Sequence, residues 1–225
     1  MNTEVFQIKK HLTEVVFILD RSGSMHGLEA DTIGGFNSML EKQKQGPGGA
    51  LISTVLFDNT CQVLHDRIPV GKVAALTDRD YRVRGCTALM DAIGGVIHHI
   101  GNVHKYARPE DVPEHTLFVI TTHGMENASC RYSAQRVRQM IERQKEKYGW
   151  EILFLGANID AVETARQFCI GGDRAVNYHA DSRGTRLNYE VLSAAISSVR
   201  SSAPLDAGWK QEIDRDYKKR GRNSD

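Results

Sequence analysis

The fold of this chain is decided by the stretch Val15-Val16-Phe17-Ile18-Leu19-Asp20-Arg21-Ser22-Gly23-Ser24. Its first five residues are apolar, which is typical of a buried strand, and this strand ends on the carboxylate of Asp20. Ser22 and Ser24 follow at intervals of two residues, and Gly23 between them allows the backbone to turn sharply. One carboxylate and two hydroxyls with this spacing can direct three oxygens toward one hard cation. The stretch therefore predicts a metal site at the end of a strand.

Two later segments supply further groups for such a site. Thr87 lies in Gly85-Cys86-Thr87-Ala88-Leu89-Met90-Asp91-Ala92, and His123 follows a second apolar strand in Leu117-Phe118-Val119-Ile120-Thr121-Thr122-His123-Gly124. Taken alone, Asp20, Ser22, Ser24 or Thr87 could be the N-cap of a helix, because such side chains satisfy free backbone N–H groups there. One cap residue suffices for a helix, so the occurrence of these motifs in this order favours the metal site.

Together these motifs resemble the von Willebrand factor A (vWA) family over most of the chain, from about residue 12 to about residue 200. In that family the metal-ion-dependent adhesion site (MIDAS) consists of D-x-S-x-S, a Thr on a second loop and an Asp in a T-D-G context. Asp20, Ser22, Ser24 and Thr87 match this pattern residue by residue, whereas His123 stands where the pattern has its last Asp. The resemblance implies an intracellular member of bacterial type that binds a divalent cation, with Mg²⁺ as the first expectation.

His123 changes the expected chemistry of the site, and three roles stay open for it. It coordinates the metal directly, it holds a metal-bound water, or it replaces the Asp in a site that no longer binds metal. Loss of one carboxylate removes an attraction of roughly 4 kcal/mol per pair of unit charges 4 Å apart at an effective dielectric of 20. Imidazole suits Mn²⁺ and other transition metals better than Mg²⁺, so the preferred ion is expected to shift toward them. Asp58 could restore part of the missing charge. Glu126 and Asp91 are weaker candidates, because Asp91, at helical spacing from Thr87, is expected to order the Thr87 loop or its helix.

The rest of the chain alternates between strand and helix patterns. We expect strands over residues 15–19, 50–57, 60–68, 116–121, 150–156 and 175–178, and helices over 28–44, 88–100, 133–147, 161–168 and 188–198. The tight turn at Asp58-Asn59 makes the strand that follows it antiparallel to its neighbour. The predicted fold is α/β, a doubly wound and mostly parallel sheet of about six strands with helices on both faces and Cys61–Ile68 as the antiparallel edge strand. Ligands of such sheets bind beyond the carboxyl ends of the strands, where Asp20 and His123 lie.

Length and composition limit the classes of function. The 225 residues fit one α/β domain, and we expect a vWA domain over residues 1–202 followed by a C-terminal tail or docking helix over 203–225. With 29 basic and 28 acidic side chains, the chain has no general attraction to nucleic acid or to a membrane. The four cysteines match no zinc-type spacing, which favours reduced thiols. Residues 1–8 lack the features of a secretory signal, and no segment approaches about 18 apolar residues, so we expect a cytoplasmic protein.

Three functions compete. The leading hypothesis is a protein-binding module, in which a cation held by Asp20, Ser22, Ser24, Thr87 and His123 keeps one coordination position open for an Asp or Glu of a protein partner. A hydrolase is the main alternative, because Ser, His123 and Asp20 are the residue types of a catalytic triad and a metal-bound water is a nucleophile. The serines share one tight turn with Asp20 and no G-x-S-x-G motif is present, which favours a protein that is not an enzyme. RNA binding is a minor alternative, supported only by Lys218-Lys219-Arg220 and Arg222.

Overall fold

A computed structural model describes residues 12–221, and within them six strands form one sheet in the order β3-β2-β1-β4-β5-β6. The strands are β1 (Leu12–Asp20), β2 (Gly49–Phe57), β3 (Cys61–Pro69), β4 (His115–Thr122), β5 (Glu151–Gly156) and β6 (Ala175–Asn177). All neighbouring pairs are parallel except β2 and β3, which are antiparallel and place β3 at an edge of the sheet. The predicted fold class and its antiparallel edge strand are therefore confirmed.

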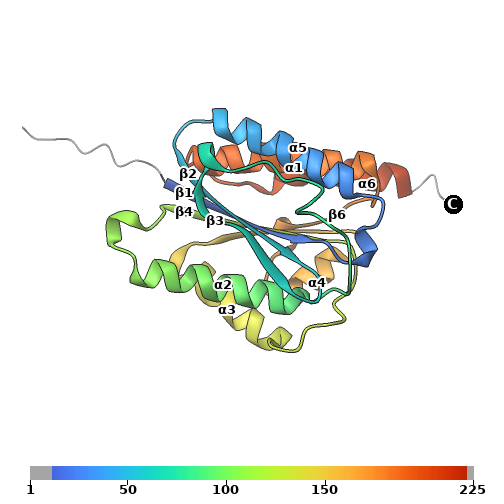
Figure 1. Ribbon diagram of the computed structural model, residues 1–225, viewed down its shortest axis with the longest axis horizontal. Helices are drawn as coiled ribbons and strands as arrows, with labels where there is room; N and C mark the ends of the chain where they lie inside the picture. The colour runs from blue at the N-terminus through green and yellow to red at the C-terminus, as the bar shows by residue number, and fades with distance from the viewer. Residues whose placement is uncertain (1–11, 222–225) are drawn as a thin grey trace, which may run out of the picture.

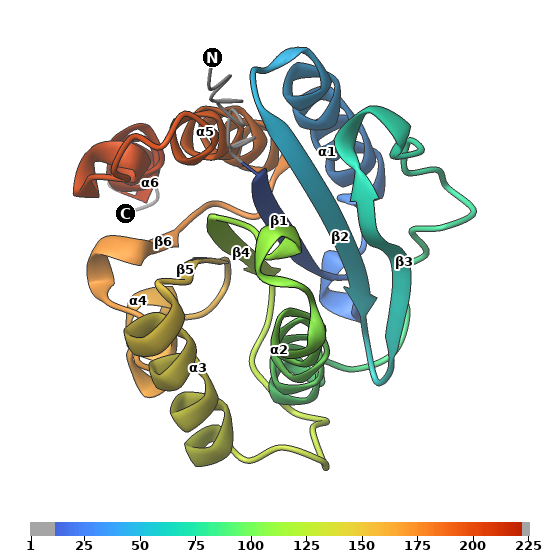
Figure 2. The same ribbon diagram turned by 90° about the vertical axis from the view of Figure 1, so that its left-hand side faces the viewer.

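Helices cover both faces of the sheet (Figures 1 and 2). The α-helices are α1 (Glu29–Gln45), α2 (Leu89–Tyr106), α3 (Ala134–Tyr148), α4 (Ala161–Gln167), α5 (Ser182–Arg200) and α6 (Gln211–Gly221). Figure 2 shows α1, α5 and α6 on one face and α2, α3 and α4 on the other. Successive residues of β1 face opposite sides of the sheet, as in any strand. Phe17 packs edge-on against Phe36 of α1, while the next residue, Ile18, belongs to the core that α2 and α3 cover.

Capping residues set the ends of several helices. The side chain of Ser133 accepts a hydrogen bond from the N–H of Arg136 at the start of α3. Gly149, in the left-handed conformation (φ 64°), caps the other end of this helix, directly after Tyr148. The side chain of Asp181 accepts the N–H of Gly184 at 2.8 Å. Because this cap precedes the apolar pattern, α5 begins at Ser182 rather than at residue 188, where the pattern predicts its start.

Helix α6 packs against α5 and β6 through a small apolar contact. Ile213 is buried and belongs to the core on the α1 and α5 face of the sheet. The division of the chain into residues 1–202 and 203–225 stays a prediction. Two sequence inferences lie outside the described residues, namely the absence of a secretory signal in residues 1–8 and the contribution of Arg222 to a basic cluster.

The described part of the chain has no helix with the length and apolar composition of a bilayer span. All four cysteines are free within it, as expected for reduced thiols, and Cys61, Cys86 and Cys130 are exposed.

The carboxyl ends of the parallel strands meet at one edge of the sheet. Backbone hydrogen bonds join the loops that leave this edge, because the N–H of Ala157 donates to the carbonyl of Thr122 and the N–H of Tyr178 donates to the carbonyl of Gly156, both at 3.1 Å. The segments that follow β4, β5 and β6 are thus held side by side at the edge of the sheet where the sequence predicts a site.

Candidate functional site

Asp20 ends β1 and is 1% exposed. Its Oδ1 accepts the N–H of Ser22 at 2.7 Å, and its Oδ2 accepts the hydroxyl of Thr122 at 2.8 Å and the N–H of His123 at 3.1 Å. Within residues 12–221, no lysine or arginine side chain forms an ion pair with Asp20. A buried carboxylate that has only neutral donors is costly to charge, and a bound cation would offset that cost.

The hydroxyls of Ser22, Ser24 and Thr87 are placed relative to one another by two contacts. The Oγ atoms of Ser22 and Ser24 are 2.9 Å apart. A Cβ atom built on Gly124 would lie 3.1 Å from Ser24 Oγ and 3.7 Å from Thr87 Oγ1. The hydroxyls of Ser24 and Thr87 therefore face the same glycine from two different loops, and the missing side chain of Gly124 leaves the space between them open.

Backbone contacts fix these loops to one another. The N–H of Gly23 donates to the carbonyl of Gly85 at 3.0 Å, which joins the D-x-S-x-S turn to the loop of Thr87. The N–H of Thr87 donates to Oδ1 of Asn127 at 2.9 Å, and the N–H of Asn127 donates back to the carbonyl of Thr87 at 3.1 Å. Asp20, Ser22, Ser24 and Thr87 are thus carried by interlocked loops at one edge of the sheet.

The ring of His123 is turned toward the β5–α4 loop. Its Nε2 lies 3.1 Å from Nδ2 of Asn158. An amide nitrogen only donates, so Nε2 accepts this hydrogen bond and the neutral ring carries its proton on Nδ1. Nδ1 is buried and has no hydrogen-bond partner among the described residues. His123 therefore contacts Asp20 through its backbone N–H, while no hydrogen bond of its ring to Asp20, Ser22 or Ser24 occurs in this part of the chain.

Asp58, considered above as a source of the missing charge, has other partners. It is 3% exposed, and its Oδ2 accepts Nε–H of Arg21 at 2.9 Å and Nε–H of Arg84 at 2.8 Å. Burial raises the pKa of Asp58, but hydrogen bonds from Arg84 and Thr60 and the charge of Arg21 outweigh burial and hold this pKa below its usual value. The expectation that Asp58 supplies charge to the metal site is wrong, because two guanidinium groups already neutralise it.

Asp91 and Glu126 order the segment between β4 and α3. The carboxylate of Asp91 accepts the backbone N–H groups of Cys130, Arg131 and Tyr132. Burial raises the pKa of Asp91, and these three hydrogen bonds bring it below its usual value. Glu126 accepts the backbone N–H groups of Met90, Ala128 and Ser129. Asp91 thus orders a loop, as predicted, but this loop is the β4–α3 segment and not the Thr87 loop or the helix of Asp91. Both carboxylates already accept several hydrogen bonds away from the site.

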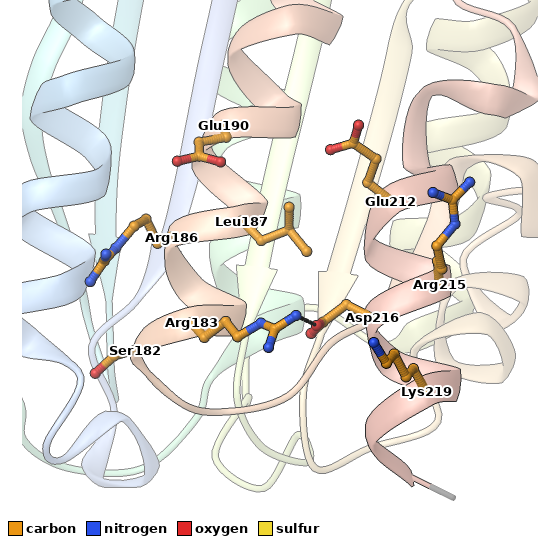
Figure 3. A pocket seen from close by; sticks show the side chains of 9 residues that line it. All are labelled: Ser182, Arg183, Arg186, Leu187, Glu190, Glu212, Arg215, Asp216 and Lys219. Carbon is orange, nitrogen blue, oxygen red and sulfur yellow. Dashed lines mark ion pairs between the residues drawn. The ribbon is translucent and has the colours of Figure 1, made fainter.

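A charged groove between α5 and α6 lies apart from these residues. Its volume is about 680 Å³, and Figure 3 shows Arg183 and Asp216 pointing toward each other across it, with an ion pair of 2.8 Å. Arg220, part of the basic cluster considered for RNA binding, pairs with both Asp216 and Asp181. Four basic side chains and three acidic side chains line the groove, so its net charge is close to neutral and it offers little of the positive charge that attracts a polyanion.

The structure of this chain is similar to several solved structures, whereas a scan of its sequence against protein-family models and a search of curated proteins find no match. The vWF domain of the type V pili tip protein Mfa5 from Porphyromonas gingivalis superposes with a TM-score of 0.57 and 10% sequence identity, over 83% of this chain and 97% of that domain. The chain has the von Willebrand factor A fold.

Two further structures support the vWA fold. The von Willebrand factor type A protein from Catenulispora acidiphila matches with a TM-score of 0.53 and 14% identity, over 84% of this chain and 43% of its own. Proximal thread matrix protein 1 from the mussel byssus, solved with a zinc-occupied MIDAS motif, matches with a TM-score of 0.55 and 13% identity, over 84% of this chain and 46% of its own. The chain spans less than half of the length of these two proteins, and at such identities the likeness is one of fold.

Sequence reasoning missed two side chains of the site of this vWA fold. Thr122, whose hydroxyl holds Asp20, directly precedes His123, and its place at the end of an apolar strand is a signal that could have found it. Asn158 follows β5 at the same edge of the sheet, but its contact with His123 depends on the rotamer of the histidine ring. No sequence pattern indicates that rotamer.

Proposed function

We propose that this chain is a metal-dependent protein-binding module. Asp20 and the hydroxyls of Ser22, Ser24 and Thr87 hold a divalent cation, and an Asp or Glu of a protein partner completes its coordination. The observation that carries the proposal is the burial of Asp20 without a cationic partner among the described residues. The other ligands are neutral, so a bound cation keeps an excess of positive charge, which attracts the carboxylate of the partner.

The donor set suits a hard cation. One carboxylate and three hydroxyls are oxygen ligands of the kind that Mg²⁺ prefers, and Mg²⁺ is the ion we propose first. The zinc-occupied MIDAS motif of the mussel protein supports a divalent cation on this fold. His123 orients Asp20 through its N–H, and a rotation of its ring away from Asn158 frees an imidazole nitrogen for the same site. In that arrangement Mn²⁺ or another transition metal is favoured.

A hydrolase receives less support from the same contacts. A catalytic triad needs a hydrogen bond between a serine hydroxyl and the imidazole of the histidine. Here the hydroxyls of Ser22 and Ser24 are hydrogen-bonded to each other, and Nε2 of His123 accepts a hydrogen bond from the side chain of Asn158. We therefore propose a binding protein rather than an enzyme, with an intracellular location as part of the proposal.

The test uses protein treated with EDTA and two short capped peptides, Gly-Glu-Gly and Gly-Gln-Gly, with and without Mg²⁺. We expect the Glu peptide to shift the amide NMR signals of Ser24, Thr87 and Gly124 only when Mg²⁺ is present, and the Gln peptide to leave them unchanged. Asp20→Ala should remove the response. The same shifts in the absence of Mg²⁺, or in Asp20→Ala, would contradict the proposal.

A further inference from the structure

A pocket of about 510 Å³ lies at the carboxyl ends of β5 and β6, at the same edge of the sheet as the candidate metal site. We call it the Tyr217 pocket, and the residues that matter for its chemistry are Asn158, Asp160, Asn177, His179 and Tyr217. They come from the β5–α4 loop, the end of β6 and the helix α6. Figure 2 shows α4, β6 and α6 together on one side of the molecule, and both helices contact β6.

Asn158 and His123 connect the Tyr217 pocket to Asp20. Asn158 lines the pocket and donates to Nε2 of His123, whose backbone N–H donates to Asp20 Oδ2 at 3.1 Å. Asn158 has a φ of 56°, in the left-handed region that residues with a side chain seldom adopt. In this conformation its amide stands between the pocket and the ring of His123. Asn158 and His123 therefore lie between a ligand in the pocket and the carboxylate of Asp20.

The Tyr217 pocket offers a flat aromatic face. The rings of His179 and Tyr217 are stacked, with centroids 4.7 Å apart and planes inclined by 29°. Nε2–H of His179 donates to the backbone carbonyl of Tyr217 at 3.1 Å, which ties α6 to the end of the sheet. Tyr217 is 39% exposed, so part of its ring is open to a ligand.

Two hydrogen-bond acceptors belong to residues that line the same pocket. Asp160 caps α4 through Oδ1, and Asn158 contacts His123 through Nδ2. In the described residues, Oδ2 of Asp160 and Oδ1 of Asn158 have no hydrogen-bond partner. A flat face next to free acceptors fits an aromatic ring that carries a hydroxyl donor, which is the chemistry of a tyrosine side chain.

We propose that the Tyr217 pocket is a second subsite, which binds a tyrosine of the same protein partner whose acidic residue reaches the metal site. That the tyrosine belongs to this partner rests on the proposed function, but the affinity of the pocket for a tyrosine ring does not require a cation. The phenol ring stacks on Tyr217, and its O–H donates to Asn158 or Asp160. Contact at two adjacent subsites gives a selectivity for the partner that one carboxylate on a cation does not provide.

The first experiment tests the pocket without metal. N-acetyltyrosinamide is titrated into EDTA-treated protein and followed by amide NMR signals, with N-acetylalaninamide as the control probe. We expect the tyrosine probe alone to shift the signals of Asn158, His179 and Tyr217. The absence of shifts at these residues would overturn the proposal.

Two variants show whether the binding uses the proposed groups. Tyr217→Ala should weaken binding of N-acetyltyrosinamide about threefold to tenfold, the usual effect of one aromatic contact. The helix should persist, because alanine favours helix and the bond from His179 ends on the backbone. Asn158→Gly, which suits the left-handed backbone, should also weaken binding. Tyr106→Ala, at a tyrosine that is 77% exposed and outside the pocket, is the matched control and should have no effect. Equal affinity in all these proteins would overturn the proposal.

A second experiment separates the pocket from the metal site. The capped peptides Glu-Gly-Tyr, Gln-Gly-Tyr and Glu-Gly-Ala are titrated in the presence of Mg²⁺. We expect Glu-Gly-Tyr to bind most tightly. Equal binding of Glu-Gly-Tyr and Gln-Gly-Tyr, with Glu-Gly-Ala weaker, supports the pocket and contradicts the metal-dependent function. Equal binding of Glu-Gly-Tyr and Glu-Gly-Ala overturns the pocket and leaves the metal-dependent function standing.

Discussion

Asp20 and Asp58 lie at the carboxyl ends of the neighbouring strands β1 and β2, but only Asp58 is paired with arginine side chains among the described residues. Asp58 accepts hydrogen bonds from the guanidinium groups of Arg21 and Arg84. In residues 12–221, Asp20 accepts hydrogen bonds only from neutral groups. A cation would therefore be superfluous at Asp58, whereas at Asp20 it would supply the missing positive charge.

The first prediction compares the removal of these two charges in the absence of metal. Asp58→Asn should lower the free energy of unfolding by about 3 kcal/mol or more, because it leaves the buried guanidinium of Arg21 without its carboxylate. Asp20→Asn should change the free energy of unfolding by less than about 1 kcal/mol, because the loss of strong hydrogen bonds is offset by the removal of an unpaired buried charge. Urea unfolding in EDTA measures both values. A larger loss for Asp20→Asn than for Asp58→Asn would contradict the assignment.

The second prediction concerns pH. The pKa values of Asp58 and Asp91 are lowered in the folded state, after burial is offset by hydrogen bonds and, for Asp58, by arginine charges. The unfolded chain then binds more protons than the folded chain near these pKa values. The stability that both carboxylates contribute is therefore present above about pH 4 and is lost as the pH falls through the folded values.

Urea unfolding between about pH 3 and pH 7 checks this sign. The free energy of unfolding of the wild type should fall below about pH 4, and its difference from Asp58→Asn should shrink over the same range. A difference that stays constant with pH would show that the ionised form of Asp58 contributes nothing.

The third prediction uses the glycine between two hydroxyls. Gly124→Ala places a methyl group 3.1 Å from Ser24 Oγ and 3.7 Å from Thr87 Oγ1, so it should weaken Mg²⁺ binding. Gly34→Ala is the matched control, because a Cβ there meets nothing within 4 Å. The control should leave Mg²⁺ binding unchanged and raise the free energy of unfolding by about 0.5–1 kcal/mol, as expected for Gly→Ala inside a helix. Calorimetric titration of Mg²⁺ into both variants measures this difference. Equal Mg²⁺ affinities of Gly124→Ala and Gly34→Ala would exclude Gly124 from the site.

Most of the fold could be predicted because apolar runs and turn residues act locally. The run 15–19 lies fully buried within β1, and the turn at Asp58-Asn59 fixes the antiparallel pairing of β2 and β3. The start of α5 was predicted too late, since the cap at Asp181 lies before the apolar pattern begins. Local capping, rather than periodicity, determines that boundary.

The site was predictable in part. Motif order placed Asp20, Ser22, Ser24 and Thr87 at one sheet edge, and the structure carries them on interlocked loops. The partners of Asp58 could not be predicted in this way. Arg21 lies within the D-x-S-x-S motif, but the spacing of residues does not indicate which carboxylate a long, flexible side chain reaches.

The most direct test of the account is calorimetric titration of Mg²⁺ into three proteins, the wild type, His123→Asp and Asp20→Ala. His123→Asp restores a hard, charged oxygen ligand, so it should raise Mg²⁺ affinity about tenfold or more over the wild type. Asp20→Ala should bind no Mg²⁺, because the hydroxyls of Ser22, Ser24 and Thr87 alone cannot hold a divalent cation. Melting temperatures should follow the same order and rise with Mg²⁺ concentration in the two binding proteins. Equal Mg²⁺ binding in all three proteins would contradict the central claim, that the unpaired charge of Asp20 holds a cation at this edge of the sheet.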